Sequence, residues 1–260
     1  MRETLKIIIK MAHPEKLYGL LGYPLVHSFS QTYFNQKFEA ENISAQYINF
    51  EIPDIGMLME VVAENENLNG LNVTIPYKEQ VIPFLDEIDP AAKEVGAVNV
   101  IKFIRDKDGL RLKGYNSDII GFTDSIKSLL KPHHRSALVL GTGGAAKAVS
   151  YSLRKLGLDV QLVSRRKSAN TLVYEELTKN DLKTHKVIVN TTPLGMYPNV
   201  DICPDIPYRY LTPQHLCYDL IYNPDETLFL KNSRQAGAQV KNGLEMLLLQ
   251  AFASYSIWNQ

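Results

Sequence analysis

The chain has 260 residues, of which 22% are charged and 45% apolar, and its 28 basic and 28 acidic side chains leave no formal net charge. That balance argues against a broad basic face for nucleic acid. Two cysteines, Cys203 and Cys217, supply neither a disulfide framework nor a metal-ligand spacing. No apolar run approaches the roughly 20 residues of a membrane span, so we expect a cytoplasmic protein without a metal or a membrane partner.

The first half of the chain alternates predicted strands and helices. Short apolar runs predict strands at 17–22, 45–50 and 70–74. Between them, helices begin at Ser30 and Asp54, both suitable capping residues. Strand–helix pairs of this kind predict βαβ units in a mostly parallel sheet. Runs at 99–104 and 110–115 flank the turn sequence Asp-Lys-Asp-Gly, which predicts a hairpin and therefore an antiparallel edge.

A second strand–helix series follows a helix that begins near Asp118. The expected elements are a strand at 137–140, a helix at 144–156, and strands at 159–163, 186–190 and 216–220. A proline-rich segment at 193–214 is irregular, and its length is typical of a functional loop. The last helix begins after Gly243.

Six short polar motifs stand in one order along this framework. They are HSFS at 27–30, NVTIPYK at 72–78, GAVN at 96–99, GYNSD at 114–118, GTGGAAKA at 141–148 and GLEMLLLQA at 243–251. The fifth is a glycine turn, and the others supply hydroxyls, amides, one lysine and one aspartate. Such a set suits a small polyhydroxylated acid. A polar substrate site together with a glycine turn for a redox cofactor suggests an oxidoreductase.

The glycine turn lies between a predicted strand and a predicted helix. Its residues are Gly141, Thr142, Gly143, Gly144 and Ala145, with the small Ala146 in the third place of the G-x-G-x-x-G/A pattern. The first glycine permits a tight turn, and the second lets the backbone approach a pyrophosphate. The helix N-terminus then offers amide N–H groups to the phosphates. We therefore expect a dinucleotide here rather than a purely structural turn.

A basic cluster follows the second strand of this unit, at Ser164, Arg165, Arg166 and Lys167. An acidic residue at this place would bind ribose hydroxyls and favour NAD, whereas basic residues accommodate the 2′-phosphate of NADP. Arginine suits that phosphate because its planar fork donates two parallel hydrogen bonds. The alternative is a solvated basic loop, but the position favours NADP.

Lys78 and Asp118 are the charged residues of the N-terminal motifs. Reduction of a ketone by hydride creates an alkoxide that needs a proton, and an ammonium beside a carboxylate can donate it. Outside such motifs, a surface salt bridge would be the preferred interpretation of a lysine and an aspartate.

Five short polar residues complete the candidate substrate site: Ser28, Ser30, Thr74, Asn99 and Gln250. They lie in or near glycine- and proline-rich turns and can bind a carboxylate and ring hydroxyls. A site of this kind rejects analogues that lack a hydroxyl, because its own polar groups would be left unpaired. The alternative for each is a cap or turn residue, and Ser30 can serve in both ways.

Together the motifs resemble the shikimate dehydrogenase family over about residues 17–258. HSFS is similar to the family's carboxylate-binding motif, NVTIPYK to its catalytic-lysine motif, GAVN and GYNSD to its asparagine and aspartate motifs, and GTGGA to its NADP turn. The resemblance further implies that Leu220 lies by the cofactor and Tyr222 by the substrate, and that Gly243 and Gln250 fill the final cofactor and substrate positions.

The resemblance implies two α/β domains. Residues 1–117 with 241–260 would form a substrate-binding and catalytic domain with a mixed sheet, and 118–240 a Rossmann-like NADP-binding domain. The site would lie in the groove between them. The implied reaction is the reversible NADPH-dependent reduction of 3-dehydroshikimate to shikimate, in chorismate and aromatic amino-acid biosynthesis, by a monomer or homodimer.

Two other functions stay open at this point. One is a quinate/shikimate dehydrogenase that uses NAD or both cofactors, against which the arginines argue. The other is a non-catalytic sensor of shikimate-like metabolites, against which Lys78 and Asp118 argue, since a sensor needs no proton transfer.

Overall fold

The computed structural model describes residues 14–25 and 29–260. The chain forms two compact units, Met1–Ser117 with Ser254–Gln260 and Asp118–Ala253. Each unit is built around one six-stranded sheet. Within the described residues, no helix is both long and apolar enough to span a bilayer.

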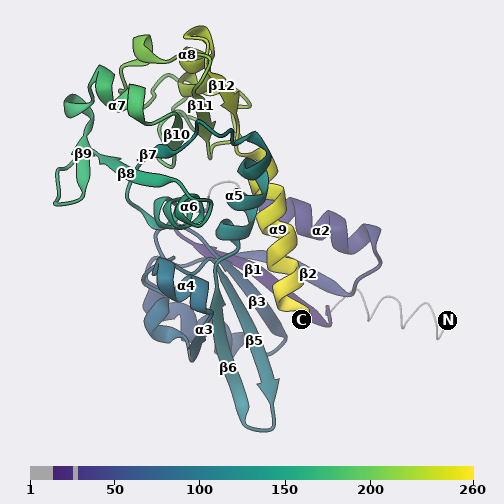
Figure 1. Ribbon diagram of the computed structural model, residues 1–260. Coiled ribbons are helices and arrows are strands. Elements are labelled where there is room, and N and C mark those ends of the chain that lie inside the picture. The colour runs from purple at the N-terminus through teal and green to yellow at the C-terminus, as the bar shows by residue number, and fades with distance from the viewer. Residues whose placement is uncertain (1–13, 26–28) are drawn as a thin grey trace. The chain divides into compact units, whose positions relative to one another are not determined.

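The first unit contains a mixed sheet (Figure 1). Its strands are β1 (Lys16–Gly22), β2 (Ala45–Glu51), β3 (Leu68–Val73), β4 (Glu87–Ile88), β5 (Val100–Asp106) and β6 (Gly109–Tyr115). Its helical segments are α2 (Phe29–Ala40), η1 (Ile55–Met57), α3 (Leu58–Glu64), η2 (Ile82–Phe84) and α4 (Pro90–Val95). The strand order is β2-β1-β3-β5-β6-β4, in which β1 pairs in parallel with β2 and β3, and β5 pairs antiparallel with β3 and β6.

Alternation along the strands of this sheet separates two packed faces. Leu71 and Val73 of β3 join an aliphatic core with residues of α3 and α4. The opposite face is aromatic, and Trp258 lies 2.3 Å from the position of a Cβ at Gly70. The indole also stacks on Tyr18, with ring centroids 4.8 Å apart. Because only glycine leaves room for the indole, β3 binds the C-terminal helix tightly.

All strand pairs in the sheet of the second unit are parallel. Its strands are β7 (Ser136–Leu140), β8 (Asp159–Ser164), β9 (Thr171–Val173), β10 (Val187–Asn190), β11 (Leu216–Asp219) and β12 (Gln239–Lys241). Its helical segments are α5 (Ser117–Ile126), η3 (Lys127–Leu129), α6 (Gly144–Lys155), η4 (Tyr174–Glu176), α7 (Lys179–Thr184), η5 (Tyr208–Tyr210), α8 (Leu228–Gln235) and α9 (Leu244–Trp258).

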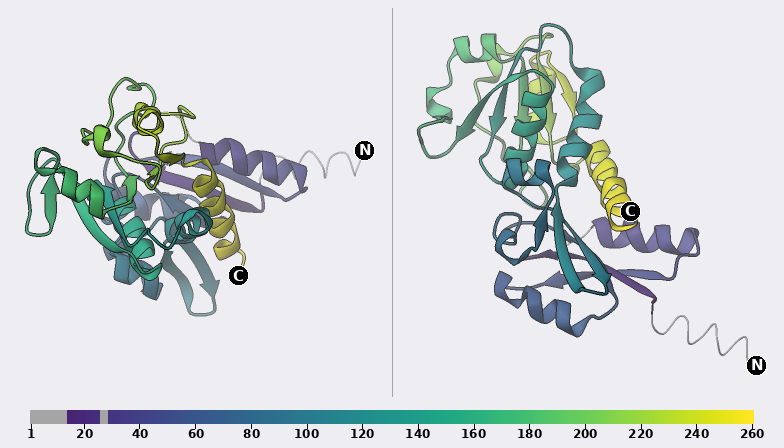
Figure 2. Two further views of the ribbon diagram at one scale, coloured as in Figure 1. Left: turned by 45° about the horizontal axis from the view of Figure 1, so that its top comes forward. Right: turned by 60° about the horizontal axis from the view of Figure 1, so that its bottom comes forward.

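The strand order of this sheet is β12-β11-β10-β7-β8-β9, which is the doubly wound order of dinucleotide-binding domains. One core packs residues of α5, α6 and α9 on the sheet, and a second core packs residues of α7 and α8 on it. Helix α9, yellow in Figures 1 and 2, belongs to both units, with residues 244–253 in the second and 254–258 in the first.

The expected α/β class, mixed first sheet and Rossmann-like second sheet are confirmed. The elements that sequence patterns missed are short: β4, α4, β9, α7, α8 and β12. A helix such as α4 has six residues and depends on the Asp89 cap and a proline in its first turn, so it shows no apolar period. The segment 193–214 is irregular apart from η5, as expected.

Candidate active site

The turn after β3 carries Thr74 and Lys78. Thr74 N–H donates to Leu21 O (2.9 Å), and Tyr77 N–H closes the turn on Thr74 O (2.9 Å). The buried Tyr77 hydroxyl donates to Ile52 O (2.6 Å), and Val98 N–H donates to Lys78 O (2.7 Å). The backbone at Lys78 is therefore anchored to the segment that carries Asn99.

Asn99 is buried and bonded to the first residue of α5. Ser117 N–H donates to Asn99 Oδ1 (2.7 Å), and Asn99 Nδ2 donates to Ser117 Oγ (3.0 Å). The backbone of Asn99 is also held, because Asn99 N–H donates to Tyr115 O (3.0 Å) and Val73 N–H donates to Asn99 O (2.8 Å). The first unit thus brings together Thr74, Asn99 and the Lys78 backbone.

Ser30 lies in the first turn of α2, where its side chain forms a hydrogen bond with Tyr47. Burial raises the pKa of Tyr47 well above its ordinary value, so this phenol stays protonated. Ser28 lies outside the described residues. Asp118 follows Ser117 in the first turn of α5, in the second unit, and is 6% exposed. A carboxylate is favoured at this end of a helix.

The glycine turn joins β7 to α6, as expected. Gly141 has φ +116°, and a Cβ there would lie 2.6 Å from Thr191 Oγ1, so both conformation and space require glycine. Gly143 is the N-terminal cap of α6, and no atom lies within 4 Å of a Cβ placed on it. The turn is open to solvent at Thr142 and Gly143. This geometry fits a pyrophosphate at the N-terminus of α6.

The switch point of the second sheet lies between β7 and β10, where the strand order reverses. Gly141 follows β7 there, and Asn190 ends β10. Thr191 Oγ1 donates to Leu140 O (2.6 Å), and Asn190 Oδ1 accepts from Thr192 N (3.0 Å) and Oγ1 (2.6 Å). Sequence reasoning missed these three residues, although an Asn-Thr-Thr-Pro turn after a buried strand was a usable signal.

The basic cluster ends β8. Arg165, Arg166 and Lys167 are exposed, and Arg166 N–H donates to Ser164 Oγ (3.3 Å). Lys167 pairs with Glu176, and this bond lowers the pKa of the Glu176 carboxyl. The two guanidinium groups are therefore the main candidates for a phosphate, with Lys167 already in an ion pair.

The end of β11 is organised by a buried carboxyl. Asp219 is 0% exposed and accepts from Thr227 Oγ1 (2.6 Å), Asn190 Nδ2 (3.0 Å) and Ile221 N (3.1 Å). Burial raises the pKa of Asp219 to about 6, against the opposing effect of these donors. Sequence reasoning assigned Asp219 no role, because burial of an acid is not visible in the sequence.

The residues after Asp219 meet the start of α9 in the second unit. A Cβ at Gly243 would collide with the Leu220 carbonyl, and Gly243 N–H donates to Ile221 O (3.0 Å). The structure therefore brings Leu220 and Gly243 together. Tyr222 is half-buried, which raises the pKa of its phenol. Further along α9, Gln250 Nε2 donates to Leu247 O (2.9 Å).

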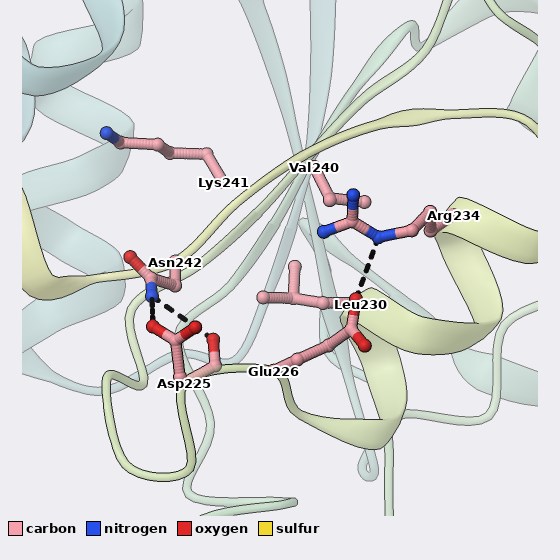
Figure 3. A pocket seen from close by; sticks show the side chains of 7 residues that line it. All are labelled: Asp225, Glu226, Leu230, Arg234, Val240, Lys241 and Asn242. Atoms are coloured by element: carbon pink, nitrogen blue, oxygen red, sulfur yellow. Dashed lines mark hydrogen bonds and ion pairs between the residues drawn. The ribbon is translucent and has the colours of Figure 1, made fainter.

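One open cavity of about 470 Å³ is lined by the end of β12 with the residue after it, and by α8 with the residues before it (Figure 3). Its walls carry paired groups, Arg234 with Glu226 (2.8 Å) and Asn242 with Asp225 (2.6 Å). None of its lining residues belongs to the predicted site. The described residues contain no cluster of three or more metal-ligating side chains.

A parallel sheet in this order, with a glycine turn at its switch point, defines a dinucleotide-binding domain. The family model for the shikimate dehydrogenase substrate binding domain matches residues 20–101. A shikimate dehydrogenase (NADP(+)) of Carboxydothermus hydrogenoformans is 39% identical over 94% of this chain and 91% of its own. The chain belongs to the shikimate dehydrogenase family.

Solved structures agree with this assignment. A crystal structure of shikimate dehydrogenase from Aquifex aeolicus aligns with a TM-score of 0.81 at 36% identity, covering 94% of this chain and 92% of the other. A quinate dehydrogenase from Corynebacterium glutamicum in complex with NAD also gives 0.81, at 26% identity, covering 94% and 93%. Both kinds of relative thus share the fold.

Proposed function

We propose that this chain is an NADP-dependent shikimate dehydrogenase, which reversibly reduces 3-dehydroshikimate to shikimate. The observation that carries the proposal is the 39% identity to a shikimate dehydrogenase (NADP(+)) over more than nine-tenths of both chains. The lysine, aspartate and asparagine of the polar motifs are all retained. The step would belong to chorismate and aromatic amino-acid biosynthesis.

Six polar residues bind the substrate in this proposal. Ser28 and Ser30 bind the carboxylate, and Thr74, Asn99, Tyr222 and Gln250 position the hydroxyls. Buried or half-buried groups of fixed orientation suit this task, because they discriminate against analogues without a matching hydroxyl. The anchored backbone of Lys78 and Asn99 supports the assignment. The division by role, 1–117 with 241–260 and 118–240, stays a prediction.

Lys78 and Asp118 handle the proton. In the direction of reduction, the ketone carbon gains a hydride, and its oxygen becomes an alkoxide. The Lys78 ammonium donates its proton to that oxygen, which leaves a neutral amine. The amine regains a proton from water before the next turnover, and in this proposal the Asp118 carboxylate assists that proton transfer. In the reverse direction the amine takes the hydroxyl proton.

The second unit binds NADP(H), which supplies or accepts the hydride. The residues fit this group: the open turn at Thr142 and Gly143, with Gly144 and Ala145 at the start of α6, can bind the pyrophosphate. Arg165 and Arg166, flanked by Ser164 and Lys167, bind the 2′-phosphate, and Leu220 and Gly243 line the nicotinamide side.

Steady-state rates with shikimate or quinate, and with NADP or NAD, test the proposal. We expect the highest kcat/KM for shikimate with NADP. A second candidate is a quinate/shikimate dehydrogenase, which is supported by the structural similarity to a quinate dehydrogenase in complex with NAD. Higher kcat/KM with quinate and NAD would select that candidate, and no absorbance change with any pair would select the sensor. The cytoplasmic location and the monomeric or homodimeric state stay predictions.

A further inference from the structure

A chain of neutral polar side chains is buried in the first unit. Tyr47 donates to Asn72 Oδ1 (2.9 Å), and Asn72 Nδ2 donates to Ser254 Oγ (2.9 Å). Ser254 Oγ lies 3.0 Å from Ser117 Oγ, which accepts from Asn99 Nδ2 (3.0 Å). These five residues, here called the buried polar chain, are each at most 6% exposed.

Backbone groups fix the orientation of both amides in this chain. A carbonyl oxygen can only accept, so the bond from Asn72 Nδ2 to Asn99 O (3.3 Å) turns the Asn72 oxygen toward Tyr47. A backbone N–H can only donate, so Ser117 N–H turns the oxygen of Asn99 toward itself. The Asn99 side chain therefore has one defined orientation, with Nδ2 facing Ser117 Oγ.

Ser254 joins parts of the first unit that are distant in the sequence. It is 182 residues from Asn72 and 137 from Ser117, and it comes from α9. The buried polar chain has a candidate substrate residue at each end. Ser30 bonds to Tyr47 at one end, and Asn99 is itself the other end. The Ser254 hydroxyl on the C-terminal helix thus connects the two halves of the buried polar chain, Tyr47 with Asn72 and Ser117 with Asn99.

We propose that Ser254 is a positioning residue that holds Asn99 in its binding orientation through Ser117. The inference rests on the proposed function, in which Asn99 binds the substrate. Without the Ser254 hydroxyl, Asn72 Nδ2 and Ser117 Oγ each lose a buried partner. Buried polar groups in a network reorganise to recover lost bonds, so Ser117 Oγ would turn away from Asn99 Nδ2, and the bond from Ser117 N–H would hold the amide less firmly.

The first test is Ser254→Ala. We expect the KM for shikimate to rise about fivefold, the size of one neutral hydrogen bond, with the KM for NADP unchanged. Ser150→Ala is the matched control, because the buried Ser150 hydroxyl on α6 has no hydrogen-bond partner among the residues that the structure describes. That variant should keep the wild-type constants. An unchanged KM for shikimate in Ser254→Ala would overturn the proposal.

A double-mutant cycle with Asn99→Ala separates positioning from general destabilisation. The loss in kcat/KM caused by Ser254→Ala should vanish in the Asn99→Ala background, and an equal loss in both backgrounds would exclude action through Asn99. If Ser254→Ala does not fold, Tyr47→Phe, which keeps the ring, takes its place in the same cycle. A wild-type chain inactive with shikimate and NADP would refute the proposed function itself, which separates the two failures.

Discussion

The two units hold their candidate sites with different kinds of buried polar group. In the first unit the buried polar chain is neutral throughout, and burial keeps Tyr47 protonated by raising its pKa. In the second unit a carboxyl, Asp219, gathers Asn190, Thr227 and a backbone N–H. The contribution of the neutral buried polar chain to stability is therefore independent of pH, whereas the Asp219 carboxyl carries a desolvation cost once it ionises.

The largest expected effect concerns chemistry in the first unit. We expect Lys78→Ala to lower kcat by about a hundredfold or more, because it removes the general acid and base. NADP affinity and the thermal unfolding midpoint should stay at wild-type values, since the buried polar chain and the core are untouched. Lys93→Ala, on the exposed surface of α4, is the control. Near-normal turnover in Lys78→Ala would remove this lysine from the mechanism.

The second prediction concerns the pH dependence of stability, which should distinguish the units. The pKa of Asp219 is about 6 in the folded chain, whereas the ordinary value for an aspartate, expected in the unfolded chain, is 3.8. Well below pH ~4 both states hold the proton. As the pH rises toward 6, the unfolded state loses the proton first, so the free energy of unfolding falls, and above about 6 the loss levels off.

Asp219→Asn should remove this cost and keep the local shape. The difference in free energy of unfolding, variant minus wild type, should grow by about 2 kcal/mol between pH ~4.5 and ~8, in urea titrations. Tyr47→Phe supplies the contrast. Because the buried polar chain is neutral, the difference in free energy of unfolding between this variant and the wild type should not change with pH. A pH-independent difference for Asp219→Asn would show that the carboxyl keeps an ordinary pKa.

The buried polar chain and the Asp219 cluster also show which features could be predicted from the sequence. Motif order and strand periodicity predicted both sheets, the glycine turn and the position of Asn99 beside a strand. The bond between Ser117 and Ser254 was not predictable, because the two residues are 137 positions apart and Ser254 lies in a largely apolar helix. Local patterns reveal which residues share an element, whereas a buried hydrogen bond depends on how distant elements pack.

The third prediction concerns exposed charge in the second unit. Arg165→Ala and Arg166→Ala should each weaken NADP binding about tenfold, since each removes charge-assisted bonds to a phosphate. NAD lacks the 2′-phosphate, so its dissociation constant should stay unchanged, and fluorescence titration with both nucleotides measures this. Equal losses for NADP and NAD would place the arginines elsewhere than at the 2′-phosphate.

The smallest expected effect is that of Lys167, because Glu176 already pairs with it. We expect Lys167→Ala to weaken NADP binding by less than about threefold, since exposed ion pairs contribute little. Glu176→Gln should strengthen NADP binding by a similar factor at low salt, because it releases the ammonium toward the phosphate, and added salt should screen the gain. If Lys167→Ala lost as much affinity as Arg165→Ala, the ammonium would have to leave Glu176 when the nucleotide binds. Nucleotide binding would then rearrange the basic loop of the second unit, whereas the buried polar chain of the first unit has no ion pair to break.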